Sequence, residues 1–273
     1  MCSSDLFSMK VFHEAPLCIF DYVQQVTDGD YALVHLFEQS DQYFQKFQDS
    51  IAKGREVILD NSIFELGEAF DHDRYYHWIM RLQPQWYIIP DVLEDCQGTI
   101  NSMDNWFSKY SVPSHIKSIG VVQGKQYKEI KECYKSINNR VDKVAISFDY
   151  SYFIKPDSKN KYKDYMSGRQ SLIDQLYFDH VINFKKPHHL LGCSLPQEFK
   201  HYQRNQYSFI DTVDTSNPVV AGLNGVVYNI DGLETKNPTK LVDYMFIDVV
   251  TGSNLMKIGY NIGRFKEFCK CTG

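Results

Sequence analysis

The sequence lacks the features that would place the chain in a membrane or outside the cell. No apolar run approaches the length of a membrane span, and the first residues, MCSSDLFSMK, lack the pattern of a secretory signal. The seven cysteines are odd in number, scattered and without a Cys-x-x-Cys pair, which argues against a disulfide framework. Only Cys269 and Cys271 lie close together, and a zinc site needs about four ligands. We therefore predict a cytosolic protein without a metal site.

Several common functional signatures are also missing. The net charge of −5 gives no overall basic field, so any contact with nucleic acid must come from a local patch. No G-x-G-x-x-G follows a strand-like run, and neither H-x-H nor H-E-x-x-H occurs. No stretch is rich enough in Pro, Gly or Ser to divide the chain, so residues 1–273 are expected to form a single domain.

What the sequence does contain is a regular alternation of apolar runs and amphipathic stretches. Strand-length apolar runs stand at 31–37, 56–60, 86–91, 118–124, 143–149, 188–194 and 207–214. Helix-length stretches lie between them at 41–53, 72–82, 99–109, 126–138, 169–182 and 196–205. Such alternation is typical of a parallel sheet covered by helices. With a weak eighth strand at 226–230 or 244–250, it predicts a (β/α)8 TIM-type barrel of the α/β class.

Polar residues stand where these apolar runs end. In a barrel the carboxyl ends of the strands form one rim, and functional groups gather there. The rim residues predicted in this way are Asp60, Asp91, Gln123, Asp149, Gly192, Asp211 and Asp214. Carboxylates crowded at a mouth of low dielectric raise one another's pKa values, which suits a nucleophile and a general base more than a structural role.

Five segments at these strand ends follow one another in a distinctive order. They are DNSIFE (60–65), IIPD with EDC (88–91, 94–96), VQGK (122–125), GCSL (192–195) and IDTVDTSNP with NG (210–218, 224–225). They resemble the segments D-S-G-G-F-Q, I-I-M-x-x-D-x-C, V-Q-G-G, G-G-L-S and V-D-x-x-D-x-x-x-P of the tRNA-guanine transglycosylase superfamily. The resemblance covers roughly residues 31–230 and is to the short phage-type branch, the DNA 7-deazaguanine transglycosylases.

The resemblance implies base exchange at a β-N-glycosidic bond, with retention through a covalent glycosyl-enzyme. No ATP, metal or other cofactor is implied. By its spacing to Pro218, Asp214 matches the family's nucleophile, and Asp211 is the rival, although the two would face opposite sides of a strand. Asp60 is the implied general acid and base.

Base binding is assigned by the same resemblance. Phe64 is the stacking candidate or a plain core aromatic, Asp91 and Gln123 would read the purine edge, and the backbone of Gly192 and Cys193 would line the floor. Asp95 is the runner-up to Asp91. The incoming base would be a 7-deazaguanine such as 7-cyano-7-deazaguanine.

Two departures and one basic segment bear on the nucleic acid. The family's cysteine-rich zinc module, which belongs to the tRNA-docking region, is reduced here to Cys269 and Cys271, and Gly-Gly has become Ser62-Ile63. The segment 150–168 is read as an inserted loop, basic and aromatic, on the face of the predicted carboxylate ring. Its predicted nucleic-acid contacts, with the residue that follows it, are Lys155, Lys159, Lys161, Lys163 and Arg169.

These features favour DNA over tRNA as the substrate, with tRNA as the alternative. The cytosol would then be the host's if a phage encodes the chain, no membrane partner is expected, and a homodimer stays open. Two other classes also stay open. One is a metal-dependent barrel hydrolase with Asp60, Asp91 and His188 or His189 as ligands. The other is a non-catalytic barrel that binds the base without forming an adduct.

Overall fold

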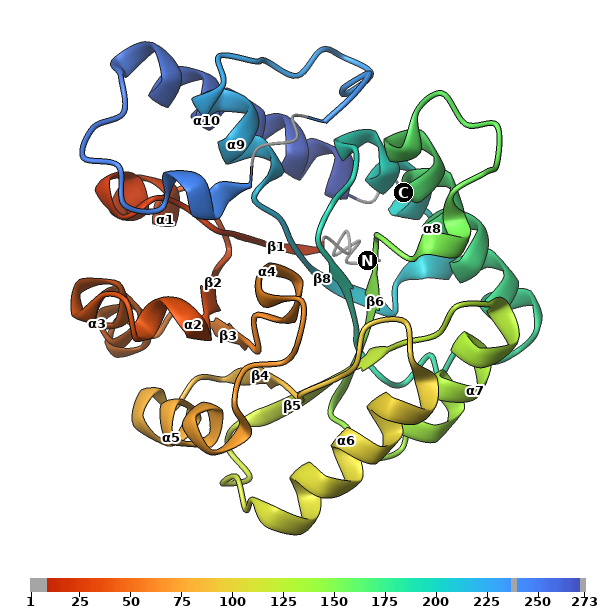
Figure 1. The fold of residues 1–273 in the computed structure, drawn as a ribbon. Coiled ribbons are helices and arrows are strands. Elements are labelled where there is room, and N and C mark those ends of the chain that lie inside the picture. Colours follow the sequence, from red (N-terminus) through yellow and green to blue (C-terminus); the bar gives the residue numbers. More distant parts are fainter. Residues whose placement is uncertain (1–8, 237–239, 271–273) are drawn as a thin grey trace, which may run out of the picture.

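The protein, described from a computed structural model, folds into a closed barrel of eight parallel strands. The structure describes residues 9–236 and 240–270. The strands are β1 (Lys10–His13), β2 (Gly29–Leu33), β3 (Val57–Asp60), β4 (Trp86–Ile88), β5 (Lys117–Val122), β6 (Lys143–Ser147), β7 (His188–Leu191) and β8 (Ile210–Asp214). They pair in chain order, and β8 pairs with β1 to close the barrel (Figure 1). The predicted (β/α)8 fold is confirmed.

Most of the helices form an outer layer around the strands, and the short α4 (Ile63–Leu66) lies inside this ring (Figure 1). The other helices are α1 (Phe20–Gln24), α2 (Val34–Phe37), α3 (Asp41–Ala52), α5 (His72–Leu82), α6 (Cys96–Lys109), α7 (Tyr127–Ile137), α8 (Lys161–Phe178), α9 (Asn217–Leu223) and α10 (Gly252–Cys269). Short 3-10 turns lie at Leu17–Ile19, Ser151–Phe153, Pro196–Gln203, Asn205–Tyr207 and Leu241–Tyr244. The helix predicted at 196–205 is therefore of the 3-10 type.

The eighth strand is not where the sequence pattern suggested. Neither 226–230 nor 244–250 is a barrel strand, because the barrel closes through β1 near the N-terminus. β1 has only four residues, KVFH, and three of them are buried. The run 31–37 also holds less strand than predicted, since β2 ends at Leu33 and the chain turns at once into α2.

The basic segment 150–168 is only partly a loop. Asn160 caps α8, with its side-chain oxygen accepting hydrogen bonds from the backbone N–H groups of Tyr162 and Lys163. The helix therefore begins at Lys161, eight residues before the predicted start. Its first turns are polar, so they lack the apolar periodicity that signals a helix.

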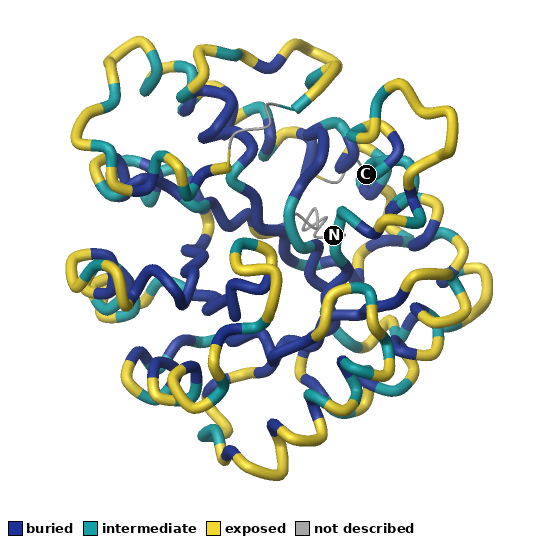
Figure 2. Tube along the Cα trace, viewed as in Figure 1, coloured by how far each residue is buried: buried dark blue, intermediate teal, exposed yellow. Residues whose placement is uncertain are grey.

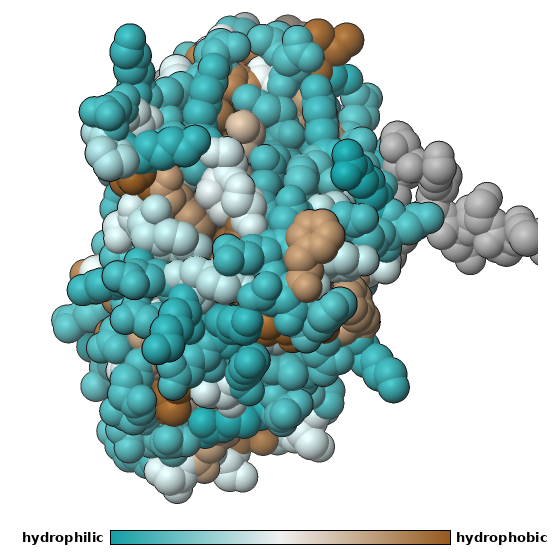
Figure 3. Space-filling view, turned by 90° about the vertical axis from the view of Figure 1, so that its right-hand side faces the viewer, coloured by the Kyte–Doolittle hydropathy of each residue, from teal (hydrophilic) through white to brown (hydrophobic). Residues whose placement is uncertain are grey.

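Burial follows the two layers. The strands and the inner faces of the helices are buried, and exposed residues lie on the outer helix faces and loops (Figure 2). The side of the molecule in Figure 3 is largely hydrophilic, with apolar side chains in scattered spots. None of the described helices is long and apolar enough to cross a membrane. Because side chains fill the interior of the barrel, a site is expected at its C-terminal mouth.

Candidate active site

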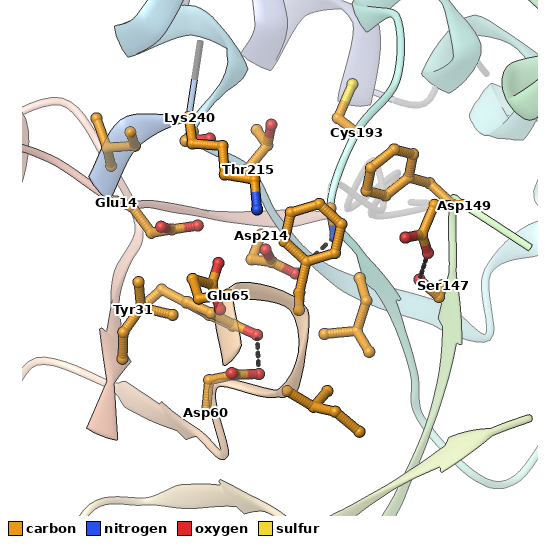
Figure 4. A pocket seen from close by; sticks show the side chains of 18 of the residues that line it. Glu14, Tyr31, Asp60, Glu65, Ser147, Asp149, Cys193, Asp214, Thr215 and Lys240 are labelled. Atoms are coloured by element: carbon orange, nitrogen blue, oxygen red, sulfur yellow. Dashed lines mark hydrogen bonds between the residues drawn. The ribbon is translucent and has the colours of Figure 1, made fainter. Parts of the chain in front are cut away.

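A cavity of about 290 Å³ opens at the C-terminal mouth of the barrel. Most of the predicted rim and base-binding residues line it: Asp60, Phe64, Asp91, Gln123, Asp149, Gly192, Cys193 and Asp214. Six carboxylates and three lysines line the cavity, namely Glu14, Asp60, Glu65, Asp91, Asp149, Asp214, Lys161, Lys236 and Lys240. In Figure 4, Glu14, Asp60, Glu65 and Asp214 lie around the same space. The predicted convergence of separate strand ends on one mouth is confirmed.

Asp214, the last residue of β8, is held by contacts to one of its two oxygens. Oδ1 accepts hydrogen bonds from Nε2 of buried His189, at 2.9 Å, and from the backbone N–H of Gly192, at 3.0 Å. His189 is itself fixed through Nδ1, 2.8 Å from the Thr212 hydroxyl. No described residue donates a hydrogen bond to Oδ2. The carboxylate is thus oriented on one side and has an oxygen available for a reaction in the cavity.

Asp60, at the end of β3, is buried and held through both oxygens. Oδ2 accepts from the Tyr31 hydroxyl at 2.7 Å, and Oδ1 accepts from the Ser62 backbone N–H at 2.5 Å. Burial, with the nearby charge of Glu65, raises the pKa of Asp60 well above its ordinary value, although these two hydrogen bonds oppose the shift. Ser62 has a φ of 61°, in the left-handed region that favours glycine. A carboxyl with a raised pKa can give or take a proton near neutral pH.

Asp91 and Gln123 form a buried polar pair across β4 and β5. Asp91 Oδ1 accepts from Asn61 Nδ2 at 2.8 Å, and Oδ2 accepts from Gln123 Nε2 at 2.6 Å. Gln123 Oε1 accepts from the Glu94 backbone N–H at 2.9 Å, so the amide cannot turn without breaking a hydrogen bond. Burial raises the pKa of Asp91 to about 6. The pair offers a carboxylate acceptor and one remaining amide N–H donor to a ligand.

The floor and lip of the cavity come from β7 and two aromatic side chains. Gly192 has a φ of 62°, and a Cβ there would lie 2.6 Å from the Phe148 ring, so the turn requires glycine. The ring of Phe64, which is 46% exposed, lies 6.1 Å from that of Phe148. Phe64 is therefore not a core aromatic, and its exposed face can receive a planar ligand. Asp149 accepts a hydrogen bond from the Ser147 hydroxyl at 2.6 Å.

Four charged residues of the site were missed in the sequence. Glu14 follows β1, Glu65 lies in α4, and Lys236 and Lys240 come from the segment between α9 and α10. Burial raises the pKa of Glu65 to about 7 and that of Glu14 well above its ordinary value. Glu65 Oε2 is buried without a hydrogen-bond partner among the described residues. Once β1 is known, the strand-end rule picks out Glu14, whereas no local signal brings Lys236 to the mouth.

Two predicted ligand contacts do not line the cavity. Asp211 is 3.1 Å from the buried Lys143 ammonium, which also donates to Thr212. Asp95 caps α6 by accepting a hydrogen bond from the Gly98 backbone N–H at 2.9 Å. The expectation that only one of Asp211 and Asp214 reaches the mouth is confirmed, and the predicted base contacts of Asp211 and Asp95 are wrong.

The predicted nucleic-acid contacts divide into four surface lysines and one buried arginine. Lys155, Lys159, Lys161 and Lys163 are all exposed, and Lys161 also lines the cavity. Arg169 has no exposed surface, because its guanidinium pairs with buried Glu198 at 2.6 Å and donates to the Leu191 and Gly192 carbonyls. The prediction for Arg169 is therefore wrong. Its contacts instead hold the β7 turn that donates to Asp214.

The metal-dependent alternative finds no ligand set in the described part of the chain. No group of three or more His, Cys, Asp and Glu side chains there is arranged to hold a metal ion. His188 lies 2.8 Å from the Tyr134 hydroxyl, and His189 lies against Asp214 rather than beside Asp60 and Asp91. Cys269 is buried, and Cys271 lies outside the described residues.

Comparison with known proteins gives no further assignment, since neither a protein-family model nor a curated protein sequence matches this chain.

Proposed function

We propose that this protein is a base-exchange glycosyltransferase that replaces guanine in DNA with a 7-deazaguanine derivative. The observation that carries the proposal is the paired geometry of Asp214 and Asp60. Asp214 is oriented through Oδ1 and leaves Oδ2 available, and Asp60 has a raised pKa in the same cavity. The left-handed Ser62 adds support, because the resembled family has glycine at that position.

In the first half-reaction, Asp214 Oδ2 attacks C1′ of a deoxyguanosine in the strand. The C1′–N9 bond breaks, its electrons leave with guanine, and Asp60 in its protonated form gives N9 a proton. The product is an ester between Asp214 and C1′. His189 and the Gly192 N–H keep Oδ1 turned away from the sugar, so one oxygen is presented to the carbon.

In the second half-reaction, a 7-deazaguanine occupies the place of guanine. Asp60, now ionised, takes the N9 proton, N9 attacks C1′, and the Asp214–C1′ bond breaks. Two displacements return the sugar to its original configuration. Asp60 therefore acts as acid in one step and base in the next, a task suited to a carboxyl whose pKa is raised by burial.

Recognition of the base falls to the Asp91–Gln123 pair and the exposed aromatic ring. The Asp91 carboxylate can accept from N–H groups of the guanine edge, and the free N–H of Gln123 can donate to its carbonyl oxygen. Phe64 offers a face for stacking. A purine held at both its edge and its face would place N9 opposite these groups, toward β8.

The strand would approach over the segment that precedes and begins α8. A nucleotide must leave the duplex, or be met in a single strand, before an enzyme can reach its C1′. Lys155, Lys159, Lys161 and Lys163 are exposed, and Lys161 lines the cavity. Lys163 is paired with exposed Glu234 at 2.7 Å, and such surface pairs contribute little, so this pairing does not prevent a phosphate contact.

Replacing Lys159, Lys161 and Lys163 together with Gln should weaken DNA binding and flatten its salt dependence. The slope of log K against log salt concentration should fall by roughly 0.7–0.9 for each lysine that binds a phosphate in the unmodified protein, because fewer counterions are released on binding. Titrations of a fluorescent oligonucleotide at several salt concentrations measure the slope.

A matched control replaces three exposed lysines at the opposite end of the barrel, Lys53, Lys117 and Lys185. This control should keep the slope of the unmodified protein. An unchanged slope in the first triple variant would remove this segment from the interface.

The reaction itself is tested with DNA that carries radiolabelled guanine. Labelled free guanine should appear when unlabelled guanine or 7-cyano-7-deazaguanine is added with the protein. Release from tRNA but not from DNA would favour the tRNA alternative. Base binding without release from either would favour the non-catalytic barrel.

A further inference from the structure

Lys236 is a charged side chain in the cavity that the proposed reaction does not use. It comes from the loop after α9, and its ammonium donates a hydrogen bond to the Cys193 carbonyl on the cavity floor at 3.0 Å. The same nitrogen lies 4.9 Å from the centre of the Phe148 ring. Burial lowers the pKa of Lys236, although carboxylates of the cavity oppose this shift. The residue is thus held at a defined place on the floor beside β7.

The ammonium has donor capacity left over. A lysine ammonium carries three N–H donors, and the hydrogen bond to Cys193 uses one. No carboxylate among the described residues lies within ion-pairing distance, 4.0 Å, of this nitrogen. Lys236 is half-buried, so its ammonium has lost part of its hydration, and a ligand that supplies an acceptor can replace it. Lys236 therefore favours a ligand group that accepts a hydrogen bond.

The order of residues round the mouth indicates which part of a base would meet this group. Following the strands, it runs Asp60 on β3, Asp91 after β4, Gln123 after β5, Cys193 after β7 and Asp214 on β8. The rim of a 7-deazaguanine runs in a matching order. From N9 it passes the 2-amino group, N1–H and the 6-carbonyl, and returns to N9 through C7 and C8.

The hydrogen-bond donors and acceptors decide in which direction the base would lie round the mouth. Asp60 stands at N9, where the proposed reaction uses it as acid and base. The Asp91 carboxylate faces the 2-amino and N1–H side, and the Gln123 N–H faces the 6-carbonyl. The substituent on C7 then falls between Gln123 and Asp214, at the Cys193 carbonyl and the Lys236 ammonium.

We propose that Lys236 is a specificity-determining residue that donates a hydrogen bond to an acceptor substituent at position 7 of the incoming base, such as a nitrile. This inference rests on the proposed base exchange and names the class of base. A 7-aminomethyl group, being cationic, would meet the like charge of Lys236. An amine that approached the Cys193 carbonyl would stand beside the Lys236 ammonium, which already donates one hydrogen bond to that oxygen. Guanine has no substituent there and serves as an internal reference.

The test measures the ratio of two incorporations in the same protein, that of 7-cyano-7-deazaguanine and that of labelled guanine into DNA. In Lys236→Met, a side chain of similar length without the ammonium, the nitrile-to-guanine ratio should fall about 10- to 100-fold, the usual worth of a charge-assisted hydrogen bond. A matched control is Lys240→Met, which removes an exposed lysine of the same cavity that lies 5.1 Å from the Phe64 ring. It should keep the ratio.

An unchanged ratio in Lys236→Met, including an equal loss of both incorporations, would overturn the proposal. A second measurement covers an inactive variant: the unmodified protein should bind the free 7-cyano base more tightly than the 7-aminomethyl base. Equal or reversed affinities would also overturn it. Absence of guanine exchange in the unmodified protein would instead contradict the proposed function, so the two failures can be told apart.

Discussion

Asp214→Asn should abolish both the release of guanine and the covalent adduct. An amide is a poor nucleophile toward C1′, and Asn keeps the size of the side chain and an oxygen that can accept from His189 and Gly192. The loss should be on the order of 10⁴-fold or more, as when a group essential to covalent catalysis is removed. The adduct is observed on a denaturing gel after protein, guanine-containing DNA and a 7-deazaguanine are mixed.

The matched control is Asp211→Asn, on the same strand. Asp211 lies against Lys143 rather than in the cavity, so this variant should still form the adduct. An adduct that persists in Asp214→Asn and disappears in Asp211→Asn would show that the nucleophile is the other residue. Base exchange by the unmodified protein with no adduct in any variant would count against the covalent mechanism.

Asp60→Asn should reduce turnover by about 10²–10⁴-fold, the usual effect of removing a general acid and base. Asn cannot take the N9 proton of the incoming base. If the second half-reaction suffers more than the first, the adduct should accumulate in this variant. Single-turnover measurements of guanine release and of base incorporation separate the two steps.

The pH dependence gives a second view of the same variant. Burial raises the pKa of Asp60 above the usual carboxyl value, so incorporation, which needs the ionised form, should rise with pH through a range above that value. This rise of the incorporation rate with pH should disappear in Asp60→Asn. It should remain in Glu65→Gln, which removes another carboxyl of the cavity, one whose pKa burial raises to about 7. If the pH dependence is lost in Glu65→Gln and kept in Asp60→Asn, the base is Glu65.

The barrel could be predicted because most of its strands appear in the sequence as short apolar runs. Six of the seven apolar runs end in polar residues or glycine at the carboxyl end of a strand or just beyond it, whereas the run 31–37 continues into α2. β1 gave no such signal in the sequence, because it has only four residues and pairing with two neighbouring strands buries three of them without a longer apolar run. The helix predicted at 169–182 was too short at its N-terminal end for a related reason. α8 begins after the capping residue Asn160, and no apolar stripe marks its first turns.

The site residues that lie at strand ends could be predicted from the sequence, and those that lie in loops could not. Asp60 and Asp214 are the last residues of strands, so the register of the barrel places them at the mouth. Lys236 reaches the same cavity from a loop after α9, and the path of that loop depends on contacts far apart in sequence. Arg169 was misplaced because a basic residue beside a basic segment looks solvent-exposed, whereas its partner Glu198 lies 29 residues away.

The central claim is that the protein exchanges guanine in DNA for a 7-deazaguanine, and nucleoside analysis tests it most directly. Purified protein is incubated with guanine-containing DNA and 7-cyano-7-deazaguanine, and the recovered DNA is digested and analysed by mass spectrometry. We expect the deoxynucleoside of the added base to appear, deoxyguanosine to fall by the same amount, and Asp214→Asn to give neither change. DNA from the unmodified protein that contains only the four ordinary deoxynucleosides would contradict the claim.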